Sequence, residues 1–504
     1  MPAVPETFVA VDLGAGSGRV ILGRFAEDRF HHEVLHRFPN RVERPDNHER
    51  WNTGILFREI LEGLRRAGAR KLPVASVGVD SWGVDFGLLD SAGRLIEEPV
   101  FYRDRRTQGR LEDIFRRVPR ESIYRTTGIQ FMEINSLVQL RAQVEDGEFP
   151  PDARILLMIA DLFQFFLSGN AVCEYTNAST TQLLNVRSRR WDEVLLRALD
   201  LPLAVMPELV GPGTVLGPLD GSVLRRLNLP GTLVVAPATH DTASAVAGTP
   251  LGPGSAYISS GTWSLVGIES TAPVLNDLAL SLNCSNEGGV GNTIRFLKNV
   301  MGLWILESCR SEWESLSGPW PHDRMFAEIE SAPPSRSFIN PDDPAFLNPP
   351  RMLSKLSAFL ERTGQPVPES RAAIARCILD SLALRYVDVL EALESAAGVS
   401  IARIHIVGGG SQNSYLNQAA ADASGLPVEA GPVEATSIGN LLVQALAARR
   451  FSTLAEGRAY VRRHAPIACF EPRNKAWWQD ARARFHTLTR RHGKENPPCS
   501  PARK

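Results

Sequence analysis

The chain has 504 residues, a formal net charge of −1 and six widely spaced cysteines. The near-neutral balance offers no basic face for nucleic acid, and the absence of a Cys-x-x-Cys pair argues against a disulfide framework or a zinc site. No apolar run reaches the roughly 18 residues of a membrane span, and the N-terminus lacks the features of a signal peptide. A soluble, cytoplasmic protein of roughly two to four domains is expected, without nucleic-acid or membrane partners.

The first predicted element is a β-hairpin over "VAVDLGAGSGRVILGRF", Val9 to Phe25. Glycines 14, 16 and 18 do not have the Gly-x-Gly-x-x-Gly spacing of a dinucleotide site, and no Gly-Lys-Ser/Thr follows as in a P-loop. A glycine-rich tip lets backbone amides approach an anion, so the hairpin is a candidate phosphate loop. An ordinary tight hairpin remains the alternative.

Further along, the pattern predicts a strand over 31–38, a helix over 53–70 and strand character over 74–90, where Asp80 and Asp85 interrupt it. A second hairpin with a small-residue tip is predicted over 255–270. The stretch 401–413 is predicted to contain a buried strand that runs into three glycines, and a helical pattern follows from Ser414. The layout predicts two α/β halves that each begin with a hairpin.

The Gly/Pro-rich segment "GTPLGPGSA", residues 248–256, is the predicted domain boundary. We therefore expect an N-terminal domain over 1–247 and a C-terminal domain over 248–488. Residues 489–504 lack apolar periodicity and are expected to form a disordered tail.

Two hairpin tips and a triple-glycine strand end from opposite halves suggest a nucleotide held in an interdomain cleft, a layout that suits phosphoryl transfer. Asp12 ends the first strand directly before the glycine tip, where its carboxylate can hold Mg²⁺ through water. Ordinary turn chemistry is the alternative for a single Asp at a strand end.

The candidate general base lies in "VVAPATHDTASAVAG", residues 234–248. A buried strand ends at His240, Asp241 and Thr242, and a helical pattern follows. Helix capping explains an isolated Asp at this position. Three polar residues at one strand end near the domain boundary favour a site in which Asp241 accepts a hydroxyl proton as that oxygen attacks the γ-phosphate.

Several other polar groups stand in apolar contexts and are candidates to read a sugar, although each also has a structural explanation. Trp82 next to Gly83 can stack on a sugar face, whereas "YRDRRT" has a surface or interlobe ion-pair cluster as its structural alternative. The full set comprises Trp82, Gly83, Arg103, Asp104, Arg106 and Asn299.

Nine segments resemble, in order, the motifs of the rhamnulokinase branch of the FGGY carbohydrate kinases. They are "VAVDLGAGSGRV", "GVDSWGVDFGLLD", "YRDRRT", "EYTNASTTQL", "ATHDTASAV", "YISSGTWSL", "LKNVMGLW", "HIVGGGSQN" and "GPVEATSIGN". The resemblance implies an actin-like α/β fold of two ribonuclease-H-like domains, with ATP and Mg²⁺ in the cleft between them. It also implies phosphorylation of L-rhamnulose at its 1-hydroxyl.

The resemblance also implies roles for individual residues. By resemblance, Asp241 corresponds to the residue that accepts the proton of the sugar hydroxyl. His240, Thr242, Gly83 and Asn299 correspond to residues that bind the sugar. The nucleotide-binding set implied by it is Ala15, Gly16, Ser17, Gly18, Arg19, Thr262, Glu307 and Gly409, and Asp12 remains the candidate metal residue.

Two departures from the family pattern bear on specificity. Glu307 stands where relatives have a Gln that contacts the nucleotide, and Met132, Glu133 and Ile134 replace a Pro- and aromatic-containing stretch near the sugar side. These departures bear on which sugar is preferred, so kinases of L-fuculose, D-xylulose or glycerol are the nearest alternatives. Hydrogen bonds to individual hydroxyl groups discriminate sugars far better than an apolar pocket does, and the pocket is not readable from the sequence. A non-catalytic actin-like nucleotide-binding protein is the alternative of a different class.

Overall fold

The computed structural model describes residues 6–347 and 349–492 and divides the chain into two compact units. Unit 1 contains Met1–Leu251, Ile268–Leu297 and Glu434–Pro466, and unit 2 contains Gly252–Gly267, Lys298–Val433 and Ile467–Lys504. Strands β16 (Trp263–Ser270) and β18 (Ile294–Met301) each continue from one unit into the other. Unit 1 therefore combines three separate stretches of the chain.

Unit 1 is built on a six-stranded sheet with the order β13-β14-β6-β1-β2-β3. Its strands are β1 (Thr7–Leu13), β2 (Ser17–Phe25), β3 (Phe30–Pro39), β6 (Ser76–Ser81), β13 (Thr214–Pro218) and β14 (Leu233–Ala236). The first three strands are antiparallel neighbours, whereas β1, β6 and β14 are parallel. The carboxyl ends of these three parallel strands consequently lie at one edge of the sheet.

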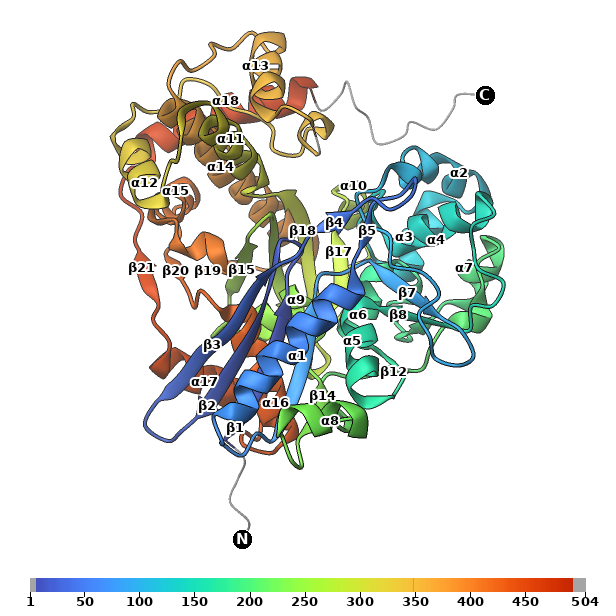
Figure 1. Ribbon diagram of the computed structural model, residues 1–504. Helices are drawn as coiled ribbons and strands as arrows, with labels where there is room; N and C mark the ends of the chain where they lie inside the picture. Colours follow the sequence, from blue (N-terminus) through green and yellow to red (C-terminus); the bar gives the residue numbers. More distant parts are fainter. Residues whose placement is uncertain (1–5, 348, 493–504) are drawn as a thin grey trace. The chain divides into compact units, whose positions relative to one another are not determined.

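Side chains alternate between the two faces of β1, and helices cover both faces. Val9 and Val11 pack with the apolar stripe of α1 (Thr53–Ala69) and with α5 (Ile159–Ser168). Phe8 and Ala10 pack on the opposite face against α16 (Ala435–Ala447). Figure 1 shows α1 running across the blue strands of the N-terminal segment, in agreement with its contacts to β2 and β3. A strand covered on both faces explains why β1 is apolar almost throughout.

Helix α16 also packs directly on α9 (Asp241–Gly248), the helix that begins at the candidate base. The backbones approach so closely that a Cβ on Gly439 would lie 1.7 Å from the Ser244 carbonyl oxygen, and a Cβ on Gly248 would lie 2.4 Å from that of Ala435. Glycine at these positions permits the helix contact that holds α9 beside the sheet.

The remaining elements of unit 1 surround this sheet or form a subdomain beyond it. The helices are α2 (Arg110–Arg117), α3 (Arg120–Thr127), α4 (Ser136–Glu145), α6 (Tyr175–Ala178), α7 (Glu193–Ala198), α8 (Gly221–Leu227), α10 (Asp277–Ser281) and α17 (Leu454–His464). The strands are β4 (Val42–Glu43), β5 (Arg50–Trp51), β7 (Phe86–Leu89), β8 (Ile155–Met158), β9 (Cys173–Glu174), β10 (Leu184–Asn185), β11 (Arg190–Trp191), β12 (Leu209–Val210) and β17 (Ser285–Gly288).

In unit 2, strands β15 (Ser255–Ser260), β19 (Arg403–Val407), β20 (Val428–Ala430) and β21 (Ala468–Phe470) are neighbours in that order. The first two pairs are parallel and the last is antiparallel. The buried 27-residue helix α14 (Arg371–Ala397) packs against several of the other helices of this unit. These are α11 (Trp304–Ser317), α12 (His322–Ser331), α15 (Ser414–Ser424) and α18 (Lys475–His492), whereas α13 (Met352–Arg362) packs against α11.

The structure confirms the two predicted hairpins, the strand over 31–38 and the helices beginning at Thr53 and Ser414. The predicted tail starts too early, because α18 continues through His492. Apolar positions of that helix, such as Leu488, pack into unit 2 although the flanking sequence is basic. Residues 493–504 lie outside the described residues. Among the described helices, none combines the length and apolar character needed to cross a bilayer.

Candidate active site

The glycine-rich turn joins β1 to β2 and leaves Gly16 and Ser17 exposed. Asn40 holds the turn from behind, since its side-chain amide donates to the Gly14 carbonyl at 3.1 Å and its backbone N–H donates to the Gly16 carbonyl at 3.1 Å. At Gly18 a Cβ would lie 2.3 Å from the ring of Phe38, so only glycine fits there. The turn thus presents exposed backbone at a fixed position, as an anion-binding loop requires.

Arg19, near the start of β2, lies directly opposite Asp12 in the antiparallel β1–β2 pairing. Its Nε lies 2.9 Å from Asp12 Oδ2 and its Nη1 lies 2.8 Å from Glu434 Oε2. Ser437 donates a further hydrogen bond to Asp12 Oδ2 at 3.0 Å. These pairs orient the Arg19 side chain toward the candidate metal residue, within unit 1.

Asp12 and Asp80 are directly paired across the parallel strands β1 and β6. Asp80 Oδ2 accepts a hydrogen bond from Asn440 at 2.6 Å, whereas Oδ1 is buried without a hydrogen-bond partner among the described residues. Burial and the negative charge of Asp12 raise the pKa of Asp80 well above its usual range. The paired carboxylates favour an additional positive charge at this edge.

The described residues contain no cluster of three or more His, Cys, Asp or Glu side chains suited to a metal ion. Mg²⁺ is commonly held through one or two carboxylates together with water and substrate phosphates. Asp12 and the unpartnered Asp80 oxygen fit that mode of binding, which needs no complete protein cage.

Strand β14 leads into Thr239, His240 and Asp241 beside the end of β6. The Ser81 N–H donates to the Thr239 carbonyl at 2.9 Å, and Ser81 forms a parallel bridge with His240. The buried Glu174 accepts from the Thr239 N–H at 2.9 Å. The start of α9 is therefore fixed to the same sheet edge as Asp12 and Asp80.

Asp241 is the first residue of α9, and His240 occupies the N-cap position without a side-chain capping bond. Asp241 Oδ1 accepts from the Thr242 N–H at 2.5 Å and from its hydroxyl at 3.2 Å. Its Oδ2 has no hydrogen-bond partner in the described part of the chain, and the side chain is 32% exposed. One oxygen is thus anchored while the other remains available to a substrate.

The electrostatic surroundings of Asp241 favour proton acceptance near neutral pH. Loss of solvation and the negative charge of Asp12 raise the pKa of Asp241 to about 7. Burial and the positive charge of Arg295 lower the pKa of His240 well below its usual range. At pH 7 the site therefore combines a titrating carboxyl with a neutral imidazole, a combination suited to general base catalysis.

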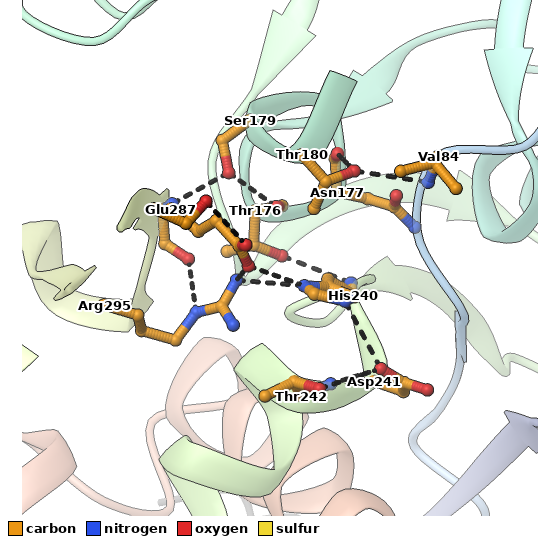
Figure 2. A network of polar contacts seen from close by, with 12 residues as sticks. Val84, Thr176, Asn177, Ser179, Thr180, His240, Asp241, Thr242, Glu287 and Arg295 are labelled. Carbon is orange, nitrogen blue, oxygen red and sulfur yellow. Dashed lines mark hydrogen bonds and ion pairs between the residues drawn. The ribbon is translucent and has the colours of Figure 1, made fainter. Parts of the chain in front are cut away.

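Figure 2 shows His240 between Asp241 and a buried ion pair of Glu287 and Arg295. Arg295 Nη2 lies 3.0 Å from His240 Nδ1 and 3.1 Å from Glu287 Oε2. Both partners come from the β17–β18 hairpin, from the part that belongs to unit 1. Asp80, Glu287 and Arg295 were not predicted as site residues, and the sequence marks Arg295 only as a cation within the apolar stretch "TIRFL".

Gly83 and Val84 form a strained bend between β6 and β7. Val84 has φ +69°, which is rare for a β-branched residue. Its N–H donates to Thr180 Oγ1 at 3.3 Å, and its carbonyl accepts from Ser136 Oγ at 2.5 Å. A Cβ on Gly83 would lie 3.0 Å from Thr180 Oγ1. Hydrogen bonds on both sides maintain the strained backbone, as is typical of ligand-binding segments.

Trp82 has a structural contact of its own, because its indole N–H donates to the buried Asp85 Oδ2 at 3.0 Å. The indole of Trp51 donates to the same oxygen at 2.7 Å. In "YRDRRT", Asp104 is buried and pairs with His48, and Arg106 donates to Gln139 at 2.9 Å. The segment is a polar cluster inside unit 1 in which Asp104 is buried, so the expected surface position of the cluster is wrong.

Unit 2 contains Thr262, Asn299, Glu307 and Gly409. Thr262 lies exposed at the β15–β16 turn, and its carbonyl accepts from the N–H groups of Gly302 at 3.2 Å and Trp304 at 3.3 Å. Gly409 is also exposed, next to Gly410, whose Cβ would meet Ser260 Oγ at 2.0 Å. Within this unit, the second hairpin tip and the triple glycine therefore meet at the end of β15.

Glu307 does not present an unpaired carboxylate. Arg310 Nη2 lies 2.7 Å from Glu307 Oε2, and the Glu307 side chain is 41% exposed. Asn299 lies half-buried in β18. Glu307 is therefore paired with Arg310 within α11.

The comparisons with known proteins agree with this architecture. Residues 7–248 match the model of the N-terminal domain of the FGGY family of carbohydrate kinases, and residues 256–448 match the C-terminal domain. The chain therefore belongs to the FGGY family of carbohydrate kinases. It is an enzyme of that class. The predicted domain boundary after residue 247 stays a prediction.

Several relatives are similar over nearly their whole length. The rhamnulokinase of Bacteroides thetaiotaomicron is 43% identical over 96% of this chain and 100% of its own length. Those of Pectobacterium atrosepticum and Bacillus subtilis are 44% and 39% identical, over 96% and 93% of this chain and 97% and 96% of their own.

Solved structures share the fold at low sequence identity. A gluconate kinase from Lactobacillus acidophilus has a TM-score of 0.78 at 15% identity, covering 96% of this chain and 98% of its own. A xylulose kinase from Rhodospirillum rubrum has a TM-score of 0.78 at 17% identity, covering 97% and 99%. These similarities establish the two-domain carbohydrate kinase fold.

Proposed function

We propose that this chain transfers the γ-phosphoryl group of ATP to the 1-hydroxyl of L-rhamnulose in the cytoplasm. The observation that carries the mechanism is the environment of Asp241: one oxygen anchored by Thr242, the other without a partner, and a pKa of about 7. The choice of sugar is supported by the 39–44% identity to proteins named rhamnulokinase.

In the proposed reaction, Asp241 accepts the proton of the sugar 1-hydroxyl as its oxygen attacks the γ-phosphorus. The new oxygen–phosphorus bond forms while the bond between the γ-phosphorus and the bridging β–γ oxygen breaks, and ADP leaves with that oxygen. On the same unit, Gly83, His240 and Thr242 are proposed to bind the sugar, and Asn299 of unit 2 is proposed to join them.

The proposed nucleotide-binding residues belong to both units. Unit 1 supplies Ala15, Gly16, Ser17, Gly18 and Arg19 of the β1–β2 turn and the start of β2, and unit 2 supplies Thr262, Glu307 and Gly409. Asp12, with Asp80 behind it, is proposed to hold Mg²⁺, which when bound supplies positive charge to the phosphate oxygens.

The direct test measures ADP release by the purified full chain with Mg-ATP and one sugar at a time. L-Rhamnulose, L-fuculose, D-xylulose and glycerol are compared with a no-sugar control. We expect the highest kcat/KM with L-rhamnulose. A preference for another acceptor would reject the proposed substrate, and no sugar-dependent release from folded, ATP-binding protein would reject the proposed reaction.

We expect kcat/KM for the sugar to fall on the acid side of about pH 7. The pKa of Asp241 is raised to about 7, so the carboxylate needed as a base is lost as the pH falls through that value. Because the pKa of His240 is lowered, its imidazole stays neutral over the same pH range and causes no second change of slope in the pH profile of kcat/KM. A profile that stays flat from pH 8 to well below 6 in folded protein would contradict the assignment.

Asp12→Ala is expected to raise the Mg²⁺ concentration that gives half-maximal rate by about ten- to hundredfold, as loss of an outer ligand does at other metal sites. The measurement is a Mg²⁺ titration at saturating ATP and sugar, with thermal unfolding as the folding control. An unchanged Mg²⁺ requirement at an unchanged rate would remove the metal role of Asp12.

A further inference from the structure

Arg295 is a charged side chain with no exposure to solvent, placed next to the proposed catalytic residues. Its Nε donates to the Gly288 carbonyl at 2.9 Å, and the Gly288 N–H donates in turn to Ser179 Oγ at 2.8 Å. Glu287, 6% exposed, lies 3.1 Å from Nη2. These contacts hold the guanidinium in one orientation (Figure 2).

The orientation of Arg295 determines which ring nitrogen of His240 carries the proton. A guanidinium has only N–H donors, so the Nδ1 atom 3.0 Å from Arg295 Nη2 accepts through its lone pair; the carboxylate oxygen Oε2 of Glu287 lies farther from the same Nδ1 atom, at 3.5 Å. In a neutral imidazole the other nitrogen, Nε2, then carries the hydrogen. Burial and the Arg295 charge lower the pKa of His240, in agreement with a neutral ring.

The Nε2 atom of this tautomer lies 3.4 Å from Asp241 Oδ1. This is an electrostatic contact and not a hydrogen bond, and it involves the oxygen that Thr242 already holds. In the opposite tautomer a lone pair would face the carboxylate and repel it. The identity of the protonated nitrogen therefore affects the orientation of the proposed base.

We infer that Glu287 and Arg295 are positioning residues that hold His240 as its Nε2–H tautomer, and that this tautomer orients Asp241 with Oδ2 free for the sugar hydroxyl. The inference rests on the proposed function for the role of Asp241. Neither Glu287 nor Arg295 contacts the reacting atoms: Arg295 acts on His240 through a hydrogen bond, and His240 acts on Asp241 through electrostatic attraction.

The first test observes the imidazole itself by ¹⁵N NMR of full-length protein labelled at histidine. His240→Gln identifies the His240 signals among those of the ten histidines. We expect a protonated Nε2 and an Nδ1 signal typical of an imine nitrogen that accepts a hydrogen bond. A proton on Nδ1, or an imidazolium at pH 7, would overturn the inference without any measurement of activity.

The second test removes the ion pair as a whole, because removal of one buried partner alone leaves an uncompensated charge. In the double variant Glu287→Met, Arg295→Met, we expect the Nδ1 signal to move to that of an unbonded imine and kcat to fall about ten- to hundredfold. Arg141→Lys is the matched control, since Arg141 is 5% exposed and paired with Glu145 elsewhere in unit 1. An unchanged Nδ1 signal or an unchanged kcat in the folded double variant would overturn the inference.

Replacement of His240 provides a third comparison, which leaves Glu287 and Arg295 themselves in place. The side-chain amide of Gln reaches the position of Nε2, whereas that of Asn reaches only the position of Nδ1. We expect His240→Gln to retain at least about tenfold more kcat than His240→Asn, because only Gln supplies an N–H toward Asp241. Equal losses would count against the inference.

These outcomes are separable from failure of the proposed function. If the wild-type chain phosphorylates none of the sugars offered, the proposed function fails while the ¹⁵N measurement still decides the tautomer. If the wild-type chain is active and His240 carries its proton on Nδ1, the positioning role fails and the kinase assignment stands.

Discussion

Asp241→Asn is expected to lower kcat for sugar phosphorylation by about 10²–10⁴-fold, the usual contribution of a general base. The carboxamide keeps the size of the side chain and can still accept from Thr242, but it cannot take up the hydroxyl proton. ATP binding and thermal stability should remain close to those of the wild type. The measurements are sugar-dependent ADP release, titration with ATP and thermal unfolding.

The matched control is Asp220→Asn, a change at the exposed N-cap of α8, where Oδ1 accepts from the Ser222 N–H at 2.8 Å. Asn caps helices as well as Asp does, so this variant should have normal stability and activity. If Asp241→Asn behaved in the same way, helix-terminal chemistry would be its only role and the general-base assignment would be wrong.

The largest expected effect on stability is that of Gly439→Ala. Gly439 lies where α16 packs against α9. The new Cβ would lie 1.7 Å from the Ser244 carbonyl oxygen and 2.8 Å from the Gly248 nitrogen, so backbone must move. Overpacking of this kind costs about 3 kcal/mol, although the higher helix propensity of Ala offsets about 1 kcal/mol. We expect a clearly lower midpoint in urea or thermal unfolding, together with lower activity as α9 and Asp241 are displaced.

Gly54→Ala is the comparison for this variant, because Gly54 also lies in a helix but its Cβ would meet only Asn52 Oδ1, at 3.6 Å. We expect unchanged or slightly higher stability there. Equal stability of the two variants would show that α9 and α16 have room to separate, contrary to the observed approach.

The fold was predictable from the sequence wherever periodicity and turn chemistry are local. The hairpin around Gly14–Gly18, the helix from Thr53 and the hairpin around Ser259–Thr262 all follow from patterns within a few tens of residues. The end of α18 was not predictable in the same way, because its last turn is helical through packing in unit 2, not through its own sequence pattern.

Some residues of the candidate site were likewise predictable from local sequence patterns, whereas others depend on tertiary contacts. Asp12, His240 and Asp241 were found because each lies at or just after the end of a buried strand, next to a turn or a helix start. Asp80 was visible only as an interruption of a strand, since its significance comes from the register that pairs it with Asp12. The roles of the site residues stay predictions, to be tested by the variants described above.

The sequence by itself determined the two α/β halves, the glycine-rich phosphate-loop candidate, the strand-end polar residues and the likeness to FGGY carbohydrate kinases. Only the tertiary structure decided that Arg295 and Glu287, more than 45 residues beyond His240, lie against its Nδ1, and that Ser437 and Asn440 reach Asp12 and Asp80. Local patterns report which backbone a segment prefers. The distances that set a pKa or a tautomer depend on segments remote in the chain, and folding alone brings these together.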